Sequence, residues 1–237
     1  MFTKQDGTLV TQADREIETV LRGRIEGRFP GHVVLGEEQG LSGGGTGPDD
    51  SGVGSGSGSP RWVVDPIDGT NNFAWGIPIF ATLIALQVGG ETEVGVVSAP
   101  ALGERYDAAA GLGARMNGSP ITVSDVATIA ESRVGFASWG GWVEAGLDRQ
   151  WGSILTRCRR SRGFGDFWGH MLVARGAAEA MAEPDLQPWD VAALSVIVAE
   201  AGGRLTDFSG APFRGRGSCL TTNGRVHDEI LAELGAG

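Results

Sequence analysis

The sequence has few cysteines and histidines, and it has no hydrophobic run long enough to cross a membrane. Its 237 residues include 2 Cys, 3 His and 1 Tyr. Two cysteines, Cys158 and Cys219, are too few for a disulfide framework, so both are expected to be free thiols in a reducing cytoplasm. No apolar segment approaches the roughly 20 residues that a membrane helix needs, and the first residues do not resemble a signal peptide. We therefore expect a cytoplasmic protein without a membrane partner.

Positive charge is also scarce. The chain carries 19 basic and 29 acidic residues, which gives a formal net charge of −10. Such a surface repels the phosphates of nucleic acids, and no basic stripe with interleaved aromatic residues offsets the repulsion. The composition therefore argues against a nucleic-acid partner and suits a site that collects cations. With 41% hydrophobic residues, the chain can build a substantial core.

The first half of the chain, residues 1–125, is expected to form a helix followed by an antiparallel sheet. A helix is predicted within 12–29 from apolar residues at helical spacing: Ile17, Val20, Leu21 and Ile25. Strand-like segments separated by turn residues follow at 31–40, 61–65, 79–88, 92–100 and 104–110. Residues 42–60 are almost entirely Gly, Ser, Pro and Asp, a composition that predicts a mobile surface loop.

The second half, residues 126–237, alternates between strand and helix patterns. Strands are expected at 133–138, 178–183 and 219–223, and helices at 148–156, 166–175, 189–202 and 226–234. The two halves together predict a layered α/β protein.

Four acidic residues stand where an apolar strand ends or a helix begins: Glu37, Asp65, Asp68 and Asp190. Strand ends and helix starts meet at the edge of α/β sheets, where four like charges would need bound cations to stay ionised. Oxygen ligands without a nearby His or Cys favour Mg²⁺ over zinc. Each signal alone has a plainer interpretation, because D-x-x-D-G is typical of a turn, Asp190 of a helix N-cap and Glu37 of a solvated strand end.

The segment from Asp65 to Asp68 is also suited to holding a cation. Pro66 fixes its own φ angle and favours an extended residue before it. Both carboxylates can then point to one side of a turn, and the carbonyl of Ile67 remains available as a further oxygen ligand.

The next two residues, Gly69 and Thr70, offer backbone N–H groups at an expected helix start, which favours phosphate binding. Other templates fit poorly. The twelfth residue counted from Asp65 is Gly76, whereas an EF-hand requires Glu there, and neither G-x-x-x-x-G-K-[ST] nor H-E-x-x-H occurs. The histidines lie far apart and are expected at the surface or satisfied in the core: His32, His170 and His227.

Three segments in this order resemble the inositol monophosphatase family over nearly the whole chain: "GEE", "WVVDPIDGTNNF" and "PWDVAALSVIVAEAGG". The resemblance implies a Mg²⁺-dependent, lithium-sensitive phosphomonoesterase with alternating α/β/α/β/α layers. It also implies two or three Mg²⁺ ions per site, with the metal ligands Glu37, Asp65, the carbonyl of Ile67, Asp68 and Asp190.

The same resemblance implies the catalytic residues Asp14, Thr70 and Glu37. Asp14, in "LVTQAD", would orient the attacking water together with Thr70, while Gly69 and Thr70 bind the phosphate. The implied reaction is direct, because one Mg²⁺ lowers the pKa of a water and another neutralises the phosphate and the leaving alkoxide. "DPIDGT" also differs from the D-x-D-x-T pattern of phosphatases with an aspartyl nucleophile.

The segment "SRGFGDFWGHMLVARGAAEAMAEPDLQPWD" is most similar to the histidinol-phosphate phosphatase branch of the family, where a Gly-Asp pair, here Gly165-Asp166, replaces a small residue after Gly. Histidinol phosphate carries an ammonium and an imidazole, so the carboxylates of Asp166 and Glu183 would favour it. Inositol offers only neutral hydroxyls, and a buried carboxylate beside them would cost desolvation energy. Asp166 fits a helix N-cap equally well. Arg162 fits a contact with phosphate or with a partner carboxylate, and it fits a surface position equally well.

The sequence departs from the family pattern in two places. Members usually have a helix before "K-x-D-x-T-x-V-T-x-A-D", whereas three residues precede Lys4 here, so weaker dimerisation and a weakened loop around Lys4 are expected. The other departure is the Gly/Ser loop at 42–60, which is expected to be an ornament rather than a lid.

Three functions remain open. The first is hydrolysis of L-histidinol phosphate in histidine biosynthesis, and the second is the same chemistry on inositol 1-phosphate or another sugar phosphate. The third is non-catalytic binding of metal and phosphate, which ranks last because Asp14, Thr70 and all four carboxylates are present. A small phosphomonoester is the expected substrate, and a homodimer is the family expectation.

Overall fold

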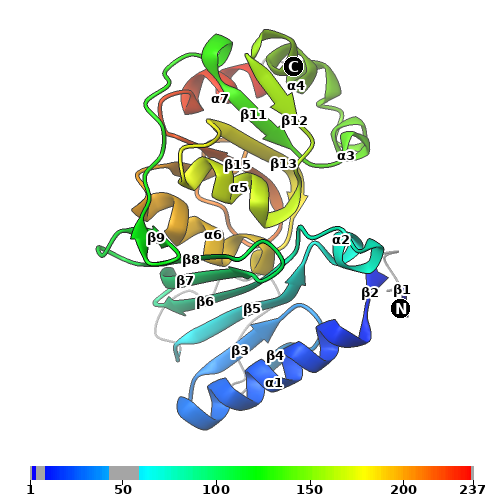
Figure 1. The fold of residues 1–237 in the computed structure, drawn as a ribbon, viewed down its shortest axis with the longest axis vertical. Coiled ribbons are helices and arrows are strands. Elements are labelled where there is room, and N and C mark those ends of the chain that lie inside the picture. Colours follow the sequence, from blue (N-terminus) through cyan, green and yellow to red (C-terminus); the bar gives the residue numbers. More distant parts are fainter. Residues whose placement is uncertain (1, 4–8, 43–58, 236–237) are drawn as a thin grey trace.

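The computed structural model describes residues 2–3, 9–42 and 59–235, and its elements stack in alternating layers (Figure 1). Helix α1 covers one face of an eight-stranded sheet, and helices α5 and α6 lie between this sheet and a five-stranded one. Helices α3, α4 and α7 cover the far side of the second sheet. The predicted α/β/α/β/α layering is therefore confirmed. Lys4 and residues 43–58 of the predicted Gly/Ser loop lie outside the described residues.

The layers are built from the following elements. The first part of the chain forms β1 (Phe2–Thr3), β2 (Leu9–Val10), α1 (Gln12–Arg28), β3 (Val33–Gly36), β4 (Gly40–Ser42), β5 (Arg61–Asp68), α2 (Thr70–Trp75), β6 (Ala81–Val88), β7 (Glu91–Ala99), β8 (Glu104–Ala109), β9 (Ala114–Met116) and β10 (Ser119–Pro120). The second part forms η1 (Ile129–Glu131), β11 (Arg133–Phe136), α3 (Trp139–Glu144), α4 (Asp148–Arg157), β12 (Arg160–Arg162), α5 (Asp166–Ala174), β13 (Ala180–Leu186), α6 (Pro188–Glu200), β14 (Arg204–Thr206), β15 (Gly217–Thr222) and α7 (His227–Leu234).

The eight-stranded sheet has the order β10-β9-β8-β7-β6-β5-β3-β4. Its neighbouring strands are antiparallel except for β3 and β5, which run parallel. The prediction of a purely antiparallel sheet is therefore wrong at this pair. The reason is that β4 turns back at the edge of the sheet, so that β5 re-enters on the other side of β3 in the same direction as β3.

Strand β5 continues beyond Asp65, where the sequence pattern predicted its end. The strand reaches Asp68, and its pairing with β6 shifts register between these two aspartates. Pro66 has no N–H for a sheet hydrogen bond, so an inner strand accommodates it where the register is irregular. The carbonyl of Pro66 accepts a hydrogen bond from Thr82 Oγ1 at 2.8 Å. The two carboxylates are thus carried on a bulged strand end, not on a turn.

The five-stranded sheet has the order β12-β11-β13-β15-β14 and mixes parallel and antiparallel pairs. Two strands of this sheet, β12 and β14, and the neighbouring helix α3 were not predicted. The two strands have three residues each and lie at the sheet edges. Helix α3 has two adjacent glycines, which disfavour a helix until packing stabilises it.

The main hydrophobic core lies between the two sheets and contains residues from both parts of the chain. Leu83 and Val97 of the first sheet pack in one cluster with Phe167, Leu194 and Ile197 of the central helices. The division into halves at 125/126 stays a prediction, because this core joins residues from both sides of it. Among the described residues, no helix is both long and apolar enough to span a membrane.

Candidate active site

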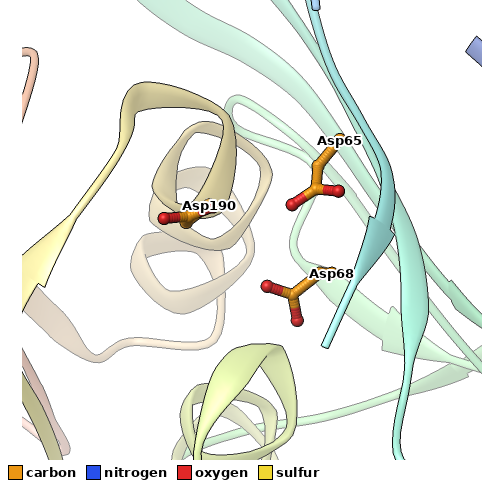
Figure 2. A group of neighbouring side chains, drawn as sticks. All are labelled: Asp65, Asp68 and Asp190. Atoms are coloured by element: carbon orange, nitrogen blue, oxygen red, sulfur yellow. The ribbon is translucent and has the colours of Figure 1, made fainter. Parts of the chain in front are cut away.

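Three of the predicted carboxylates meet where the inner strand β5 of the first sheet ends (Figure 2). Asp65 and Asp68 come from the end of β5, and Asp190 comes from the first turn of α6. Each offers one oxygen, and these oxygens lie within 4.8 Å of one another. Figure 2 shows Asp65 and Asp68 projecting from the strand toward the helix that carries Asp190. Residues far apart in the sequence therefore form one acidic cluster, which we call the carboxylate cluster.

A pocket of about 170 Å³ opens at this cluster. Its lining residues include Glu37, Asp65, Ile67, Asp68, Gly69, Thr70, Asp166 and Asp190. A larger cavity of about 640 Å³ lies elsewhere, against α6 and the Gly89-Gly90 turn, and none of the predicted site residues lines it. The smaller pocket is the candidate active site, because it is where the charged side chains converge.

Burial and mutual repulsion make the cluster hard to ionise. Burial raises the pKa of Asp65 and of Asp68 well above the usual range, and neighbouring carboxylates raise both further. Burial and the charges of Glu37, Glu183 and Asp166 raise the pKa of Asp190 to about 8, although part of its surface faces the pocket and a hydrogen bond from Gln187 opposes the rise. A cation would favour the ionised form of each group.

The residues of the cluster fit a divalent cation. Oδ1 of Asp65 is buried and accepts no hydrogen bond from the described residues. An orphaned buried oxygen is costly in a folded protein unless an unobserved water or ion satisfies it. The metal-ligand atoms that the cluster offers are all carboxylate oxygens, which Mg²⁺ and similar hard cations prefer.

Asp190 is held in place by the start of its own helix. The helix begins at Pro188, Gln187 is the N-cap, and Asp190 is the third helical residue. Its Oδ2 accepts a hydrogen bond from the backbone N–H of Gln187 at 2.7 Å, which closes a capping box. Asp190 therefore caps from within the helix, not from the N-cap position that its plainer interpretation assigned. This bond fixes the carboxylate beside Asp65 and Asp68.

Asp14 and Thr70 lie next to each other, although 55 residues separate them in the chain. Asp14 is fully buried, and its Oδ2 accepts hydrogen bonds from the backbone N–H and the hydroxyl of Thr11 at 2.8 and 2.6 Å. Its Oδ1 lies 3.4 Å from Thr70 Oγ1, which is also 2.9 Å from the carbonyl oxygen of Ile67. One hydroxyl proton serves one of these two acceptors at a time. Thr70 thus lines the pocket, Asp14 is buried next to it outside the pocket lining, and the catalytic role of the pair stays a prediction.

Gly69 occupies a position that other residues cannot take. Its φ angle is +81°, in the left-handed region. A Cβ atom there would lie 2.9 Å from the carbonyl oxygen of Ile79 and 3.4 Å from Asp166 Oδ2. Gly69 therefore allows α2 to begin close to Asp166.

The turn that carries Glu37 is held by hydrogen bonds to Glu18, a residue that the sequence analysis did not identify. Glu18, buried on α1, accepts hydrogen bonds from the backbone N–H groups of Glu38 and Gln39 at 2.8 and 3.1 Å. It also pairs with the buried Arg22 at 2.8 Å. In a helix with helical apolar spacing, such charged residues are expected to face solvent.

Replacing Glu18 with Ala is expected to lower the free energy of unfolding by about 3 to 5 kcal/mol, because it leaves Arg22 buried without its partner. Urea denaturation measures the loss. Glu16→Ala, at an exposed position of the same helix, is the matched control and should stay within about 0.5 kcal/mol of the wild type. Similar unfolding midpoints for both variants would contradict this account of the turn.

Asp166 lines the pocket and does not cap its helix. The N-cap position is Gly165, and Asp166 is the first helical residue with a φ angle of +60°. Its Oδ2 accepts a hydrogen bond from Asn72 Nδ2 at 2.9 Å. The N-cap interpretation is therefore wrong, because the left-handed backbone turns the carboxylate toward α2 and the pocket. Burial and the charge of Glu183 raise the pKa of Asp166 to about 7.

The other two predicted substrate residues, Glu183 and Arg162, are not among the described residues that line the pocket. Glu183 is buried on β13, where its Oε1 lies 3.2 Å from His170 Nε2. Arg162 is exposed on β12, and its Nη1 donates to the carbonyl of Ser161 at 2.8 Å. Their roles toward a substrate stay predictions.

Two side chains at the site were missed by the sequence analysis. Asn72 holds Asp166, and it stands in the quoted "DGTNNF" segment, so its position beside the phosphate residues was an available signal. His170 had no such signal, because only the folded chain brings it to Glu183. The prediction that the histidines are core or surface residues fits their positions: His170 and His227 are fully buried with hydrogen-bond partners, and His32 is half-buried.

Comparison with known proteins places these features in a family context. The sequence pattern of the inositol monophosphatase family matches residues 2–236. The chain is similar to the histidinol-phosphatase of Mycobacterium tuberculosis, with 44% identity over 99% of this chain and 88% of that protein. It is 41% identical to the histidinol-phosphatase of Streptomyces coelicolor, over 98% of this chain and 86% of that one. Among solved structures, an IMPase of Thermotoga maritima has a TM-score of 0.83 and 32% identity, covering 98% of this chain and 86% of its own.

Proposed function

The chain belongs to the inositol monophosphatase family, and from this membership we propose that it is a phosphoric monoester hydrolase that converts L-histidinol phosphate to L-histidinol and phosphate. The histidinol-phosphatases with which it shares 41 to 44% identity along nearly all of its length support this choice of substrate.

The observation that carries the proposal is the position of Asp166. Its carboxylate lines the pocket beside the carboxylate cluster, and its Oδ2 is steadied by Asn72. The ammonium group of histidinol phosphate is a suitable partner for an anion at this position, since charge-assisted hydrogen bonds are stronger than neutral ones. Inositol phosphate offers only hydroxyls there.

The proposed cofactor is Mg²⁺, with two or three ions held by Glu37, Asp65, the carbonyl of Ile67, Asp68 and Asp190. When bound, the ions lower the pKa of water and neutralise charge on the phosphate and the leaving oxygen. The orphaned Oδ1 of Asp65 supports the cation site, and the oxygen-only ligand set supports the choice of Mg²⁺.

The chain's own residues orient the reactants. Thr70 Oγ1 accepts a hydrogen bond from the attacking water. Its hydroxyl donates a hydrogen bond to Asp14 Oδ1, which lies 3.4 Å away. The left-handed Gly69 lets the backbone approach the phosphate at the start of α2. Asp68 is held by the backbone N–H of Phe167 at 2.7 Å, so the element that carries Asp166 also positions a cluster carboxylate. No group of the protein becomes covalently attached to phosphate.

We propose a cytoplasmic homodimer, with the metal residues mainly in residues 1–125 and the substrate-selecting residues in 126–237.

A side-by-side assay tests the choice of substrate. With Mg²⁺ present, kcat/KM for phosphate release from L-histidinol phosphate is expected to exceed that for inositol 1-phosphate. The similarity to the Thermotoga maritima IMPase favours the second candidate, an inositol or sugar phosphate. Equal or better turnover of inositol 1-phosphate would decide for that candidate, and Mg²⁺ binding without turnover of any phosphomonoester would decide for a non-catalytic binder.

The variant Asp166→Asn tests the residue that carries the proposal. Asn tolerates the left-handed backbone of this position and keeps the shape of the side chain, so the substitution mainly removes the charge. We expect kcat/KM for histidinol phosphate to fall by about 10- to 100-fold, as for the loss of a charged hydrogen bond, while Mg²⁺ affinity measured by calorimetry stays within about twofold. An equal fall in kcat/KM for inositol 1-phosphate would show that Asp166 does not recognise the ammonium group.

A further inference from the structure

His170 is a fully buried histidine with a hydrogen bond on each ring nitrogen. It lies on α5, which packs against β13 and β15. Its Nδ1 is 2.7 Å from Thr221 Oγ1, and its Nε2 is 3.2 Å from Glu183 Oε1. A buried polar ring is retained at low cost only when both nitrogens are satisfied, and here both are.

The partners of the ring determine where its proton lies. A carboxylate only accepts hydrogen bonds, so Nε2 carries a proton and donates a hydrogen bond to Glu183. Nδ1 then accepts a hydrogen bond from the hydroxyl of Thr221. The sheet fixes both partners, because Thr221 is paired with Met181 and Glu183 is paired with Cys219 between the same two strands.

Glu183 is linked to the pocket through α5, because His170, which contacts it, stands four residues after the pocket residue Asp166 on the same helix. After burial, its charge is the next cause of the raised pKa of Asp166, and it also raises the pKa of Asp68 and of Asp190. The side chain of Glu183 keeps 9% of its surface exposed, although that of His170 keeps none. A small part of the Glu183 side chain is therefore exposed, while its Oε1 is in contact with His170.

We propose that His170, fixed by Thr221, positions the carboxylate of Glu183 as the second anionic group, beside Asp166, that receives the ammonium of the substrate. This inference rests on the proposed function. His170 acts through Glu183 and touches no substrate atom. Without the Nε2 donor, Glu183 Oε1 loses its hydrogen bond and the carboxylate rotates away from its present position. This change weakens the recognition of a cation and leaves the phosphate chemistry in place.

The test uses the full chain with Mg²⁺ and two substrates. Histidinol phosphate carries the ammonium, and p-nitrophenyl phosphate has no cation. For His170→Met, the ratio of kcat/KM for the first substrate to that for the second is expected to fall by about 10- to 100-fold, with the loss in KM. His170→Gln keeps an N–H donor that can reach Glu183, and it should restore at least half of this loss on a logarithmic scale. An unchanged ratio in His170→Met, or the same loss in both variants, would overturn the inference.

His227 provides a matched control for the general cost of replacing a buried histidine. It is fully buried on α7 between Thr206 and Thr222, each 2.9 Å from a ring nitrogen, and it does not line the pocket. His227→Met should lower the melting temperature as His170→Met does, without changing the substrate ratio. A similar change of the ratio in both variants would assign the effect to loss of packing and overturn the inference.

A spectroscopic measurement separates this inference from the proposed function and does not require the variants to be active. In ¹⁵N NMR of the wild type, His170 is expected to carry a proton on Nε2, and Glu183→Gln should shift that nitrogen. A neutral ring with its proton on Nδ1 would overturn the inference whatever the substrate. If the contact is found and the wild type prefers inositol 1-phosphate, the proposed function fails and the ammonium role fails with it.

Discussion

Replacing Asp65 with Asn is expected to reduce kcat/KM for phosphate release by about 10³-fold or more. The change removes the charge of a carboxylate whose Oδ1 is buried and accepts no hydrogen bond from the described residues. A cation that stabilises transition-state charge contributes several kcal/mol, and each 1.4 kcal/mol corresponds to about a factor of ten in rate. Initial rates over a range of Mg²⁺ concentrations measure the effect, and the Mg²⁺ requirement should rise as well.

The same variant should be more stable than the wild type when metal is removed. Burial and repulsion by Glu37, Asp68 and Asp190 raise the pKa of Asp65, so the ionised form opposes folding and a neutral side chain relieves that cost. This gain separates loss of the cation site from unfolding. Asp125→Asn, at an exposed aspartate paired with Arg225, is the control and should change neither rate nor stability appreciably. An Asp65→Asn enzyme with normal activity would contradict the assignment.

The metal-free protein is expected to lose stability as the pH rises from 6.5 to 8.5. The pKa of Asp166 is raised to about 7 and that of Asp190 to about 8, in both cases first by burial. In this interval the folded state binds more protons than the unfolded state, whose aspartates are already ionised. The free energy of unfolding therefore falls, by up to about 1.4 kcal/mol per pH unit for each proton involved.

His227 does not oppose this trend between pH 6.5 and 8.5. Burial lowers the pKa of His227 to about 4, so this histidine favours the folded state increasingly as the pH rises toward 6.5 and adds little above it. Urea denaturation in a chelator at several pH values measures the trend. Saturating Mg²⁺ should flatten or reverse it, because the cation binds the ionised cluster. A metal-free stability that does not fall across the interval would contradict the strained cluster.

Much of the fold followed from short-range patterns, and the differences have physical causes. The apolar spacing around Ile17 and Ile25 predicted α1, and the apolar run after Trp189 predicted α6. The extension of β5 through Pro66 was missed because proline normally excludes an inner strand, and only the register shift against β6 accommodates it. The parallel pairing of β3 with β5 depends on how β4 turns back, which no local pattern contains.

The site divides in the same way. The carboxylates that meet at the sheet edge stood in recognisable segments of the sequence, so their convergence was predictable from where strands and helices end. The side chains that support the site through hydrogen bonds could not be predicted in this way. Glu18, Asn72 and His170 gain their importance from partners 20, 94 and 13 residues away, respectively, which only the folded chain brings into contact.

Asp65, Asp68 and Asp190 are expected to form a divalent cation site on which the phosphatase reaction depends. A crystal of the protein grown with Mn²⁺ and measured near the manganese absorption edge tests it directly, because the anomalous signal locates the ion without assumptions about the protein. We expect an anomalous peak within bonding distance of carboxylate oxygens of all three residues, and we expect Asp65→Asn to lose this peak. Well-ordered carboxylates without a peak at saturating Mn²⁺, or a peak only elsewhere in the molecule, would contradict it.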